Sequence, residues 1–239
     1  MGRGQRPRAG TTILYLCLLA LVSLPAAASG ATAFVMPDPT SSLYRSFVAV
    51  GGASLIVQQS CSLTGNLQSN GSLALALGDH VTGNVSAVGL IVNLGTVSGT
   101  VTSGAPAKTL PALPTQAQAL ALANRVFTTN TTFNNAEIDD VVFVEGDVHV
   151  QGSLDGRGTL IVLHDLTIDG TDAAHPIPLA ATTRLSILAL HDIHVGQLRP
   201  LRGLLYAGHD AGLQSQTSFQ GVAIAAHNLT IASSAQLAF

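Results

Sequence analysis

Apolar and polar residues alternate in short runs along the second half of the chain, and these runs recur at a fixed spacing. Five runs share one pattern, at positions 146–150, 164–168, 191–195, 209–213 and 227–231. Their Asp or Asn position falls at 147, 165, 192, 210 and 228, so the successive steps are 18, 27, 18 and 18. The long step equals one period plus a further half period. We place these extra residues in a protruding loop within 169–181, because Pro176 and Pro178 lie there.

Each run carries the same columns of apolar residues. The first column holds Val148, Leu166, Ile193, Ala211 and Leu229, and the second holds Val150, Ile168, Val195, Leu213 and Ile231. His149, Thr167, His194, Gly212 and Thr230 lie between them, which gives the alternation of a strand with one buried face. A further apolar column precedes the Asp position by four: Phe143, Ile161, Leu188, Tyr206 and Ile224. Gly158, Gly203 and Gly221 share a position where the chain would turn a corner.

The first half repeats the period more weakly. Thr64-Gly65-Asn66 recurs one full period later as Thr82-Gly83-Asn84, and Ser98-Gly99-Thr100 follows after a slightly shorter step. A unit of this length cannot bury its apolar face alone, whereas stacked units can. The pattern therefore predicts an all-β fold, a single-stranded parallel β-helix with rungs of about 18 residues. A β-sandwich is the alternative, but its antiparallel strands would not keep one register over five units.

Proline separates the two halves at Pro106, Pro111 and Pro114. Thr115 is a suitable N-cap for a short helix over 116–126, which would pack beside the coil or cap an open end. We expect 128–135 to form a loop. The predicted organisation is a signal peptide (1–28), a lead-in or cap (29–53), a first β-helix portion (54–104), a separator (105–135) and a second β-helix portion (136–239).

Positions 1–28 have the pattern of a secretory signal. Arg3, Arg6 and Arg8 precede an apolar run over 13–24, and small side chains over 25–28 suit cleavage. An uncleaved membrane anchor is the alternative, although the run is shorter than the roughly 20 residues of a spanning helix. We expect a secreted, periplasmic or cell-surface protein, with membrane contact only if the signal is not cleaved. Cys61 is then the only cysteine of the mature chain, so no internal disulfide can form.

Composition excludes several classes of function. The chain has 10 Lys and Arg against 13 Asp and Glu, a net charge of −3, so no nucleic-acid partner is expected. A disordered chain would carry more charge than 10% and a smaller apolar share than 47%. The regular Thr column of an ice-binding face is absent, because His149, His194 and Gly212 interrupt Thr167 and Thr230.

Two segments carry a resemblance to a known family: VFVEGDVHV at 142–150 and GSLDGRGTLIVL at 152–163. Positions 54–239 resemble secreted bacterial β-helix domains related to polymer-forming, bactofilin-like proteins, which are often found near pilus-assembly or surface proteins. The family's corner reads Gly-Asp or Gly-Asn. Here Gly146-Asp147 keeps that form, while His stands at the Gly position in the later rungs. The resemblance implies a right-handed helix with a scaffold or assembly role, without catalytic residues.

The histidine column is the main chemical feature of the sequence. If the register holds, His164, His191, His209 and His227 stack beside Asp165, Asp192, Asp210 and Asn228. Neighbouring imidazoles with an Asp could share Zn²⁺, Ni²⁺ or Cu²⁺. A solvated corner needs no metal, however, and a surface that titrates near neutral pH is an alternative. We assign no metal and no cofactor, and predict weak metal binding at most. The Gly-Asp-rich consensus of calcium-binding β-rolls is absent.

These features favour an exported, non-enzymatic structural, assembly or interaction module of the cell envelope or surface. The alternative is a carbohydrate-binding or carbohydrate-cleaving β-helix, that is, a polysaccharide hydrolase or lyase. Paired carboxylates such as Asp139 and Asp140, or Asp165 and Asp192, would suit glycoside hydrolysis, but Trp is absent and no nucleophile motif is present. Expected partners are a second copy, joined through the β-helix ends, and envelope or pilus proteins. The final rung at 222–231 is expected to be the open end.

Overall fold

The computed structural model describes residues 46–169, 185–196 and 200–238, which belong to one compact unit, Phe34–Phe239. The predicted signal peptide and nearly all of the predicted loop at 169–181 lie outside these ranges. None of the helices in the described ranges is long and apolar enough to cross a membrane.

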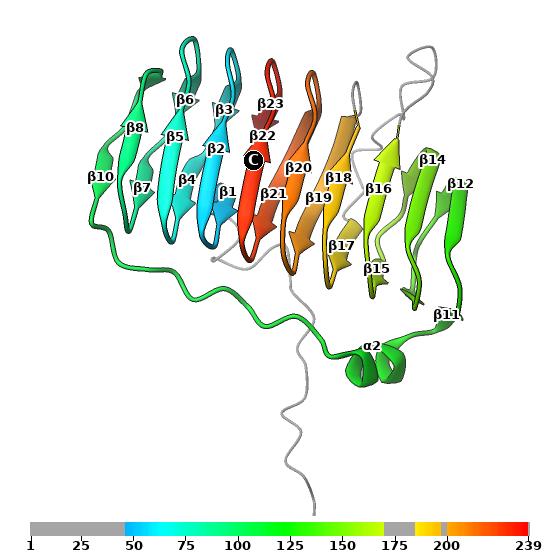
Figure 1. The fold of residues 1–239 in the computed structure, drawn as a ribbon. Coiled ribbons are helices and arrows are strands. Elements are labelled where there is room, and N and C mark those ends of the chain that lie inside the picture. The colour runs from blue at the N-terminus through cyan, green and yellow to red at the C-terminus, as the bar shows by residue number, and fades with distance from the viewer. Residues whose placement is uncertain (1–45, 170–184, 197–199, 239) are drawn as a thin grey trace, which may run out of the picture. The chain divides into compact units, whose positions relative to one another are not determined.

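The described strands form a parallel β-solenoid of about 10 turns with about 18 residues per rung, accompanied by a single short helix in the described ranges, as the sequence predicted (Figure 1). The strand pairings in these ranges are parallel. We call the strand layers faces A, B and C.

Face A contains, in spatial order, β10 (Val101–Ser103), β7 (Val85–Ala87), β4 (Asn66–Ser69), β1 (Phe47–Gly51), β21 (Ser218–Ala225), β19 (Pro200–Ala207), β17 (Leu185–Ala189), β15 (Thr159–Val162), β13 (Val141–Val144) and β11 (Arg125–Phe127). Face B contains β12 (Thr131–Glu137), β14 (Val148–Asp155), β16 (Leu166–Asp169), β18 (Ile193–Val195), β20 (Ala211–Leu213), β22 (Asn228–Ile231), β2 (Ser54–Val57), β5 (Ser72–Leu75) and β8 (Ile91–Asn93). Face C contains β23 (Gln236–Ala238), β3 (Ser62–Thr64), β6 (His80–Thr82) and β9 (Thr96–Val97), and β23 pairs with the start of β21.

The rungs are not stacked in chain order. Strands β1, β2 and β3 pair with β21, β22 and β23, so the first and last described strands meet in the middle of the solenoid. From there the chain winds out to β10, crosses back along the solenoid, and winds inward again from β11 (Figure 1). The prediction that 222–231 forms an open final rung is therefore wrong, because β21 and β22 are paired on both sides.

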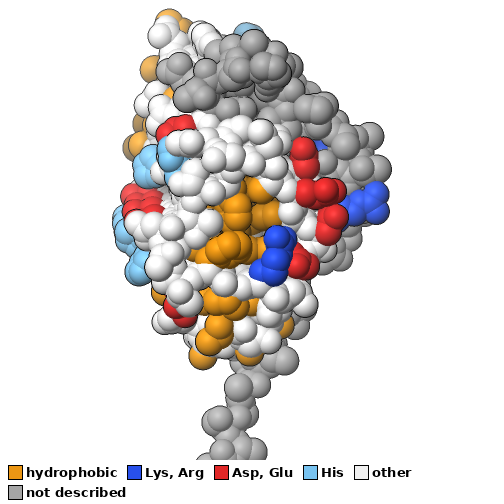
Figure 2. Space-filling model, turned by 90° about the vertical axis from the view of Figure 1, so that its right-hand side faces the viewer, with side chains coloured by type: hydrophobic (Ala, Val, Ile, Leu, Met, Phe, Trp, Pro, Cys, Tyr) orange, Lys and Arg blue, Asp and Glu red, His pale blue; other side chains and the backbone are white. Residues whose placement is uncertain are grey.

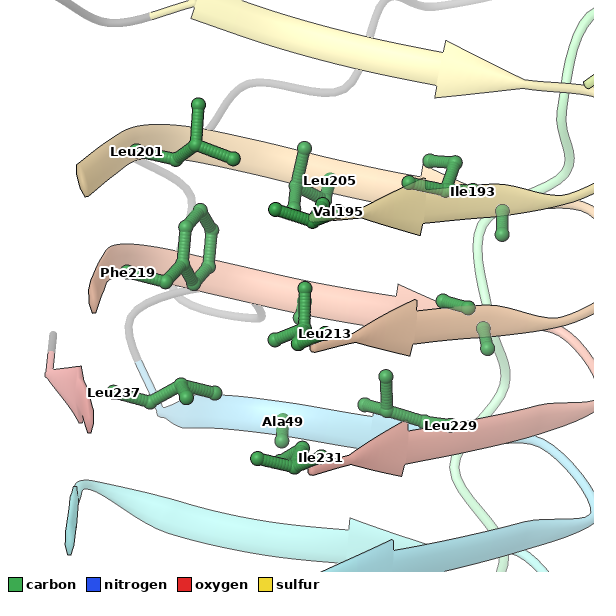
Figure 3. Close-up of a cluster of buried hydrophobic side chains, with 14 of the residues drawn as sticks. Ala49, Ile193, Val195, Leu201, Leu205, Leu213, Phe219, Leu229, Ile231 and Leu237 are labelled. Atoms are coloured by element: carbon green, nitrogen blue, oxygen red, sulfur yellow. The ribbon is translucent and has the colours of Figure 1, made fainter. Parts of the chain in front are cut away.

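The predicted core columns are confirmed. On face B, Val148, Leu166, Ile193, Ala211 and Leu229 follow one another in register, and the N-terminal half adds Leu55 and Leu73 to the same column. All of these side chains are buried. Figure 3 shows side chains from both halves in this one core, with Ala49 of β1 close to Ile231 of β22.

The column that contains Phe143 and Ile161 is buried in a second core, separate from the one inside the coil. Strands such as β13 and β15 are buried on both faces because the crossing segment packs over face A. Leu110, Leu113 and Ala119 supply the apolar side chains of that cover. The hydroxyl of Tyr206 donates to the carbonyl of Pro111 at 2.5 Å and attaches the segment to face A.

The short helix α2 (Gln116–Leu122) begins where predicted. Thr115 is its N-cap and forms a capping box with Gln118. The prediction of helix to position 126 and of a loop over 128–135 is wrong, because β11 and β12 occupy this region. Pairing with β13 and β14 supplies backbone hydrogen bonds that outweigh the local preference, so the separator ends at Asn124.

The assignment of 29–53 to a lead-in or cap is also wrong in its described part. β1 is a full strand of face A, and Val48 and Ala49 are completely buried. β1 pairs on one side with β4, one rung later in the chain, and on the other with β21, which lies at the far end of the chain.

Two of the predicted corner glycines have the backbone that only glycine adopts easily. Gly203 has φ of 130° and Gly221 has φ of 144°, and the two are paired across neighbouring rungs. A Cβ on Gly221 would lie 1.9 Å from the carbonyl oxygen of Gly203, so no larger residue fits.

Candidate functional site: a histidine and aspartate ladder

The Asp column lies at the corner between faces A and B, where it joins successive rungs. Each carboxylate accepts a hydrogen bond from the backbone N–H of the residue one rung further along. The donor–acceptor distances are 3.3 Å from Asp165 to Asp147, 3.2 Å from Asp192 to Asp165, 2.9 Å from Asp210 to Asp192 and 2.9 Å from Asn228 to Asp210. The side chains of this column therefore tie each rung to the next through the backbone.

Three histidines stack beside these carboxylates. The Nδ1 atoms of His191, His209 and His227 lie 2.5, 3.2 and 3.0 Å from Oδ1 of Asp165, Asp192 and Asp210. The rings of His191 and His209 are nearly parallel, with centroids 5.4 Å apart, and those of His209 and His227 are 4.8 Å apart. We call these six residues the His–Asp ladder. Figure 2 shows His and acidic side chains next to one another along one side of the molecule.

The fourth predicted member, His164, has an exposed side chain, and the stacked pairs found among the described residues do not include it. The structure therefore brings together three of the four predicted histidines.

Electrostatics within the ladder favour the charged pair of His191 and Asp165. The hydrogen bond to Asp165, followed by the nearby carboxylate of Asp192, raises the pKa of His191 above its usual 6.5. Partial burial of Asp165 opposes its ionisation, but hydrogen bonds from His191 and from the N–H of Asp192 outweigh it and lower the pKa of Asp165 below 3.8. Asp210 behaves in the same way: burial is outweighed by the N–H of Asn228 and by His227, and its pKa is lowered.

A groove of about 580 Å³ lies beside the ladder over β12, β14 and β16. The carboxylates of Asp147, Asp165 and Asp169 line it together with His149, Asn130 and three Thr side chains. His149 Nε2 lies 3.0 Å from Asp169 Oδ2, a second His–Asp contact. The sequence did not reveal this pair, because Asp169 follows the repeated columns and has no equivalent in the other rungs.

The second chemical feature that the sequence did not reveal is a carboxylate inside the coil. Asp79 is fully buried and accepts hydrogen bonds from the N–H groups of Cys61 and Ala76 at 2.9 and 2.7 Å. Burial raises the pKa of Asp79, and burial raises that of the adjacent Cys61 thiol to about 11. The thiol is a free, unreactive core group. In the sequence, only the Gly78-Asp79 pair between two strands could have indicated this buried carboxylate.

Comparisons with known proteins assign no family to this chain. No family model matches it, and no curated protein matches it. Among solved structures, it is similar to an ice-binding protein from the Antarctic ascomycete Antarctomyces psychrotrophicus, with a TM-score of 0.42 and 13% sequence identity over 80% of this chain and 93% of that one. A likeness this distant supports no conclusion about function.

Proposed function

We propose that this protein is an exported, non-enzymatic structural module of the cell envelope or surface that assembles end to end with further copies of itself. The observation that carries the proposal is the state of the two solenoid ends. Among the described residues, β8, β9 and β10 at one end each pair with a single strand, as do β11 and β12 at the other. Each end therefore presents backbone N–H and C=O groups to a further strand.

Apolar side chains accompany these open edges. Leu90, Val92, Leu94 and Val101 are exposed at the β8–β10 end, and Val126 is exposed at the other. Phe127 and Phe133 pack edge to face, 5.7 Å apart, over the last buried rung at the β11–β12 end. Figure 2 shows this end, with apolar side chains gathered in its middle and charged side chains around them. An apolar centre with a charged rim is typical of a protein interface.

The two ends match each other in strand direction. Both halves of the chain advance the same way along the solenoid, because face A runs from β11 through β21 to β1 and β10. In a head-to-tail contact, β10 of one copy would pair with β11 of the next, and β8 of the first would pair with β12 of the next. Every new pairing would be parallel. Such a contact joins two different surfaces, so it propagates into a filament. The proposal that the protein is exported rests on the signal pattern at 1–28.

The test compares two exposed apolar residues of one column on face B. Ile56 of central β2 and Val92 of terminal β8 both align with Ala74, and their side chains are 42% and 47% exposed. We expect the unmodified protein to gain mass with concentration in light scattering and to form filaments by electron microscopy. Val92→Lys should remain monomeric, because a lysine on an open edge strand opposes pairing with a further strand. Ile56→Lys lies in a strand that is already paired on both sides and should assemble normally. A monomeric unmodified protein at high concentration, or equal assembly of both variants, would contradict the proposal.

A second candidate is carbohydrate binding in the groove over β12, β14 and β16. Its three carboxylates favour this function, although its described lining holds no Trp, Tyr or Phe platform. Asp169→Asn keeps the shape of the side chain and removes a charge. A carbohydrate that binds the unmodified protein and not this variant would support the second candidate over the first.

A further inference from the structure

Two groups of three residues in the His–Asp ladder have the composition of a metal site. They are His191, Asp192 and His209, and His209, Asp210 and His227. Within each group, one potential ligand atom per residue lies within 4.8 Å of the others. Two imidazoles and one carboxylate form a donor set that suits Zn²⁺ and its neighbours among the divalent transition metals.

The carboxylate of Asp192 faces two imidazole nitrogens. Its Oδ2 lies 3.7 Å from His191 Nδ1, and its Oδ1 lies 3.2 Å from His209 Nδ1. Asp210 repeats the arrangement, with 3.6 Å to His209 Nδ1 and 3.0 Å to His227 Nδ1. Two ligands of a tetrahedral zinc ion lie about 3.3 Å apart, so these separations are close to those of a bound site.

The backbone holds these side chains in position. Parallel pairing fixes Ile193, Ala211 and Leu229, each two residues after a ladder histidine, in adjacent positions on face B. The Oδ1 atoms of Asp192 and Asp210 accept N–H groups of the next rung, which orients each carboxylate and leaves its Oδ2 for another partner. The three histidine side chains are 50–57% exposed, so the rings can tilt toward an ion. The ion takes the place of the proton that each Nδ1 shares with the carboxylate of the preceding rung, and that proton is released to water.

We propose that this corner is an exchangeable site for one divalent transition-metal ion, with Zn²⁺ as the representative. The ion is held by His209 Nδ1, the Nδ1 of His191 or His227, and the Asp between them, and the remaining position is open to water or to a ligand from solution. His209 belongs to both groups and has one Nδ1, so the two sites exclude each other. The ladder then binds one ion per chain. The proposal is independent of end-to-end assembly, because all of its ligands come from one chain.

Titration calorimetry of untagged protein with zinc chloride at neutral pH tests the proposal. We expect one ion per chain with an affinity in the micromolar range, consistent with three ligands that are partly exposed to solvent. His209→Ala should weaken binding at least about tenfold, since it removes a ligand from both groups. His191→Ala and His227→Ala should each retain one ion with lower affinity, because each leaves one group complete. The matched control is His164→Ala, which lies in the same column outside both groups and should bind zinc like the unmodified protein.

A second measurement on the unmodified protein avoids any effect of substitution on folding. Modification of histidines by diethyl pyrocarbonate, mapped by mass spectrometry, should slow at His191, His209 and His227 when zinc is added and should not change at His164. Absence of zinc binding would overturn the proposal. So would binding that His209→Ala leaves intact, or protection of His164 equal to that of the other three.

Discussion

At the corner between faces A and B, one short polar side chain per rung accepts the backbone N–H of the next rung. The corner between faces C and A uses the same device, where Asn66 accepts the N–H of Asn84 at 2.8 Å and Asn84 accepts that of Thr100 at 2.9 Å. A buried or half-buried N–H without a partner costs free energy, so Asp and Asn recur at these positions. The repeat that is visible in the sequence is therefore the imprint of inter-rung hydrogen bonding.

The inward columns on face B should tolerate no charge. Ile168 is fully buried between Val150 and Val195. Ile168→Asp would place a carboxylate there without a partner and should reduce the free energy of unfolding by at least about 3 kcal/mol. Urea denaturation measures the loss. The control, His194→Ser, changes an exposed outward residue of the next strand and should be nearly silent. Unchanged stability of Ile168→Asp would show that this face does not point inward.

Stability should depend on pH through His191 and Asp165. The raised pKa of His191 gives stabilisation that is complete below pH 6.5 and is lost as the pH rises through the raised value. The lowered pKa of Asp165 gives stabilisation that is complete above pH 3.8 and is lost as the pH falls through the lowered value. We expect the melting temperature of the unmodified protein to exceed that of His191→Gln most between these limits, and the difference to shrink as the pH rises through the raised pKa of His191. A constant difference from pH 4 to 9 would contradict this prediction.

At the scale of elements, the crossing segment 105–124 explains why face A is apolar on both sides. Local pattern predicted a buried column at Phe143 and Ile161, and this is confirmed, but it could not identify the partner that covers them. The attachment is polar as well as apolar. The side chain of Asn70 donates to the carbonyl of Lys108 and accepts its N–H, both at 2.7 Å.

This attachment gives a simple protease experiment. Lys108 is the only lysine in the sequence, so a lysine-specific protease has a single cleavage site. Asn70→Ala removes both hydrogen bonds and should release the segment, which would increase the cleavage rate at Lys108. Asn70→Asp keeps the acceptor and loses the donor, so its cleavage rate should fall between those of the unmodified protein and Asn70→Ala. Equal rates in all three proteins would mean that these bonds do not hold the segment against face A.

At the scale of the whole molecule, the solenoid is continuous in space but interrupted in sequence. Ala238 pairs with Thr64, and Phe47 pairs with Asn66. The gap between Ala238 and Phe47 therefore corresponds to Gly65 of the next rung. A short flexible link across it would turn the strands into one uninterrupted spiral from β11 to β10.

A circular permutant tests this arrangement. The variant begins at position 105, runs to position 238, continues through a short glycine linker to position 46 and ends at position 104. All described strand pairings and the crossing segment are retained, so we expect the same circular dichroism spectrum and a single cooperative melt. Two separate melts or loss of the β spectrum would show that the first and last strands do not meet as described.

The parallel solenoid, the length of its rungs, the inward columns and the stacking of histidine beside aspartate could all be predicted from the chain alone. These features depend on local alternation and on side chains that repeat one rung apart, and a repeat leaves both in the chain. Three other features emerged only from the folded molecule: β1 joins β21, polar β12 is a strand, and the separator covers face A. Each of these depends on contact with a partner that the local pattern does not identify: β21 and face A are distant in sequence from β1 and the separator, and β14 lies one rung beyond β12. The free energy of that contact outweighs the local conformational preference of the segment, and a short sequence pattern does not show which partner supplies the contact.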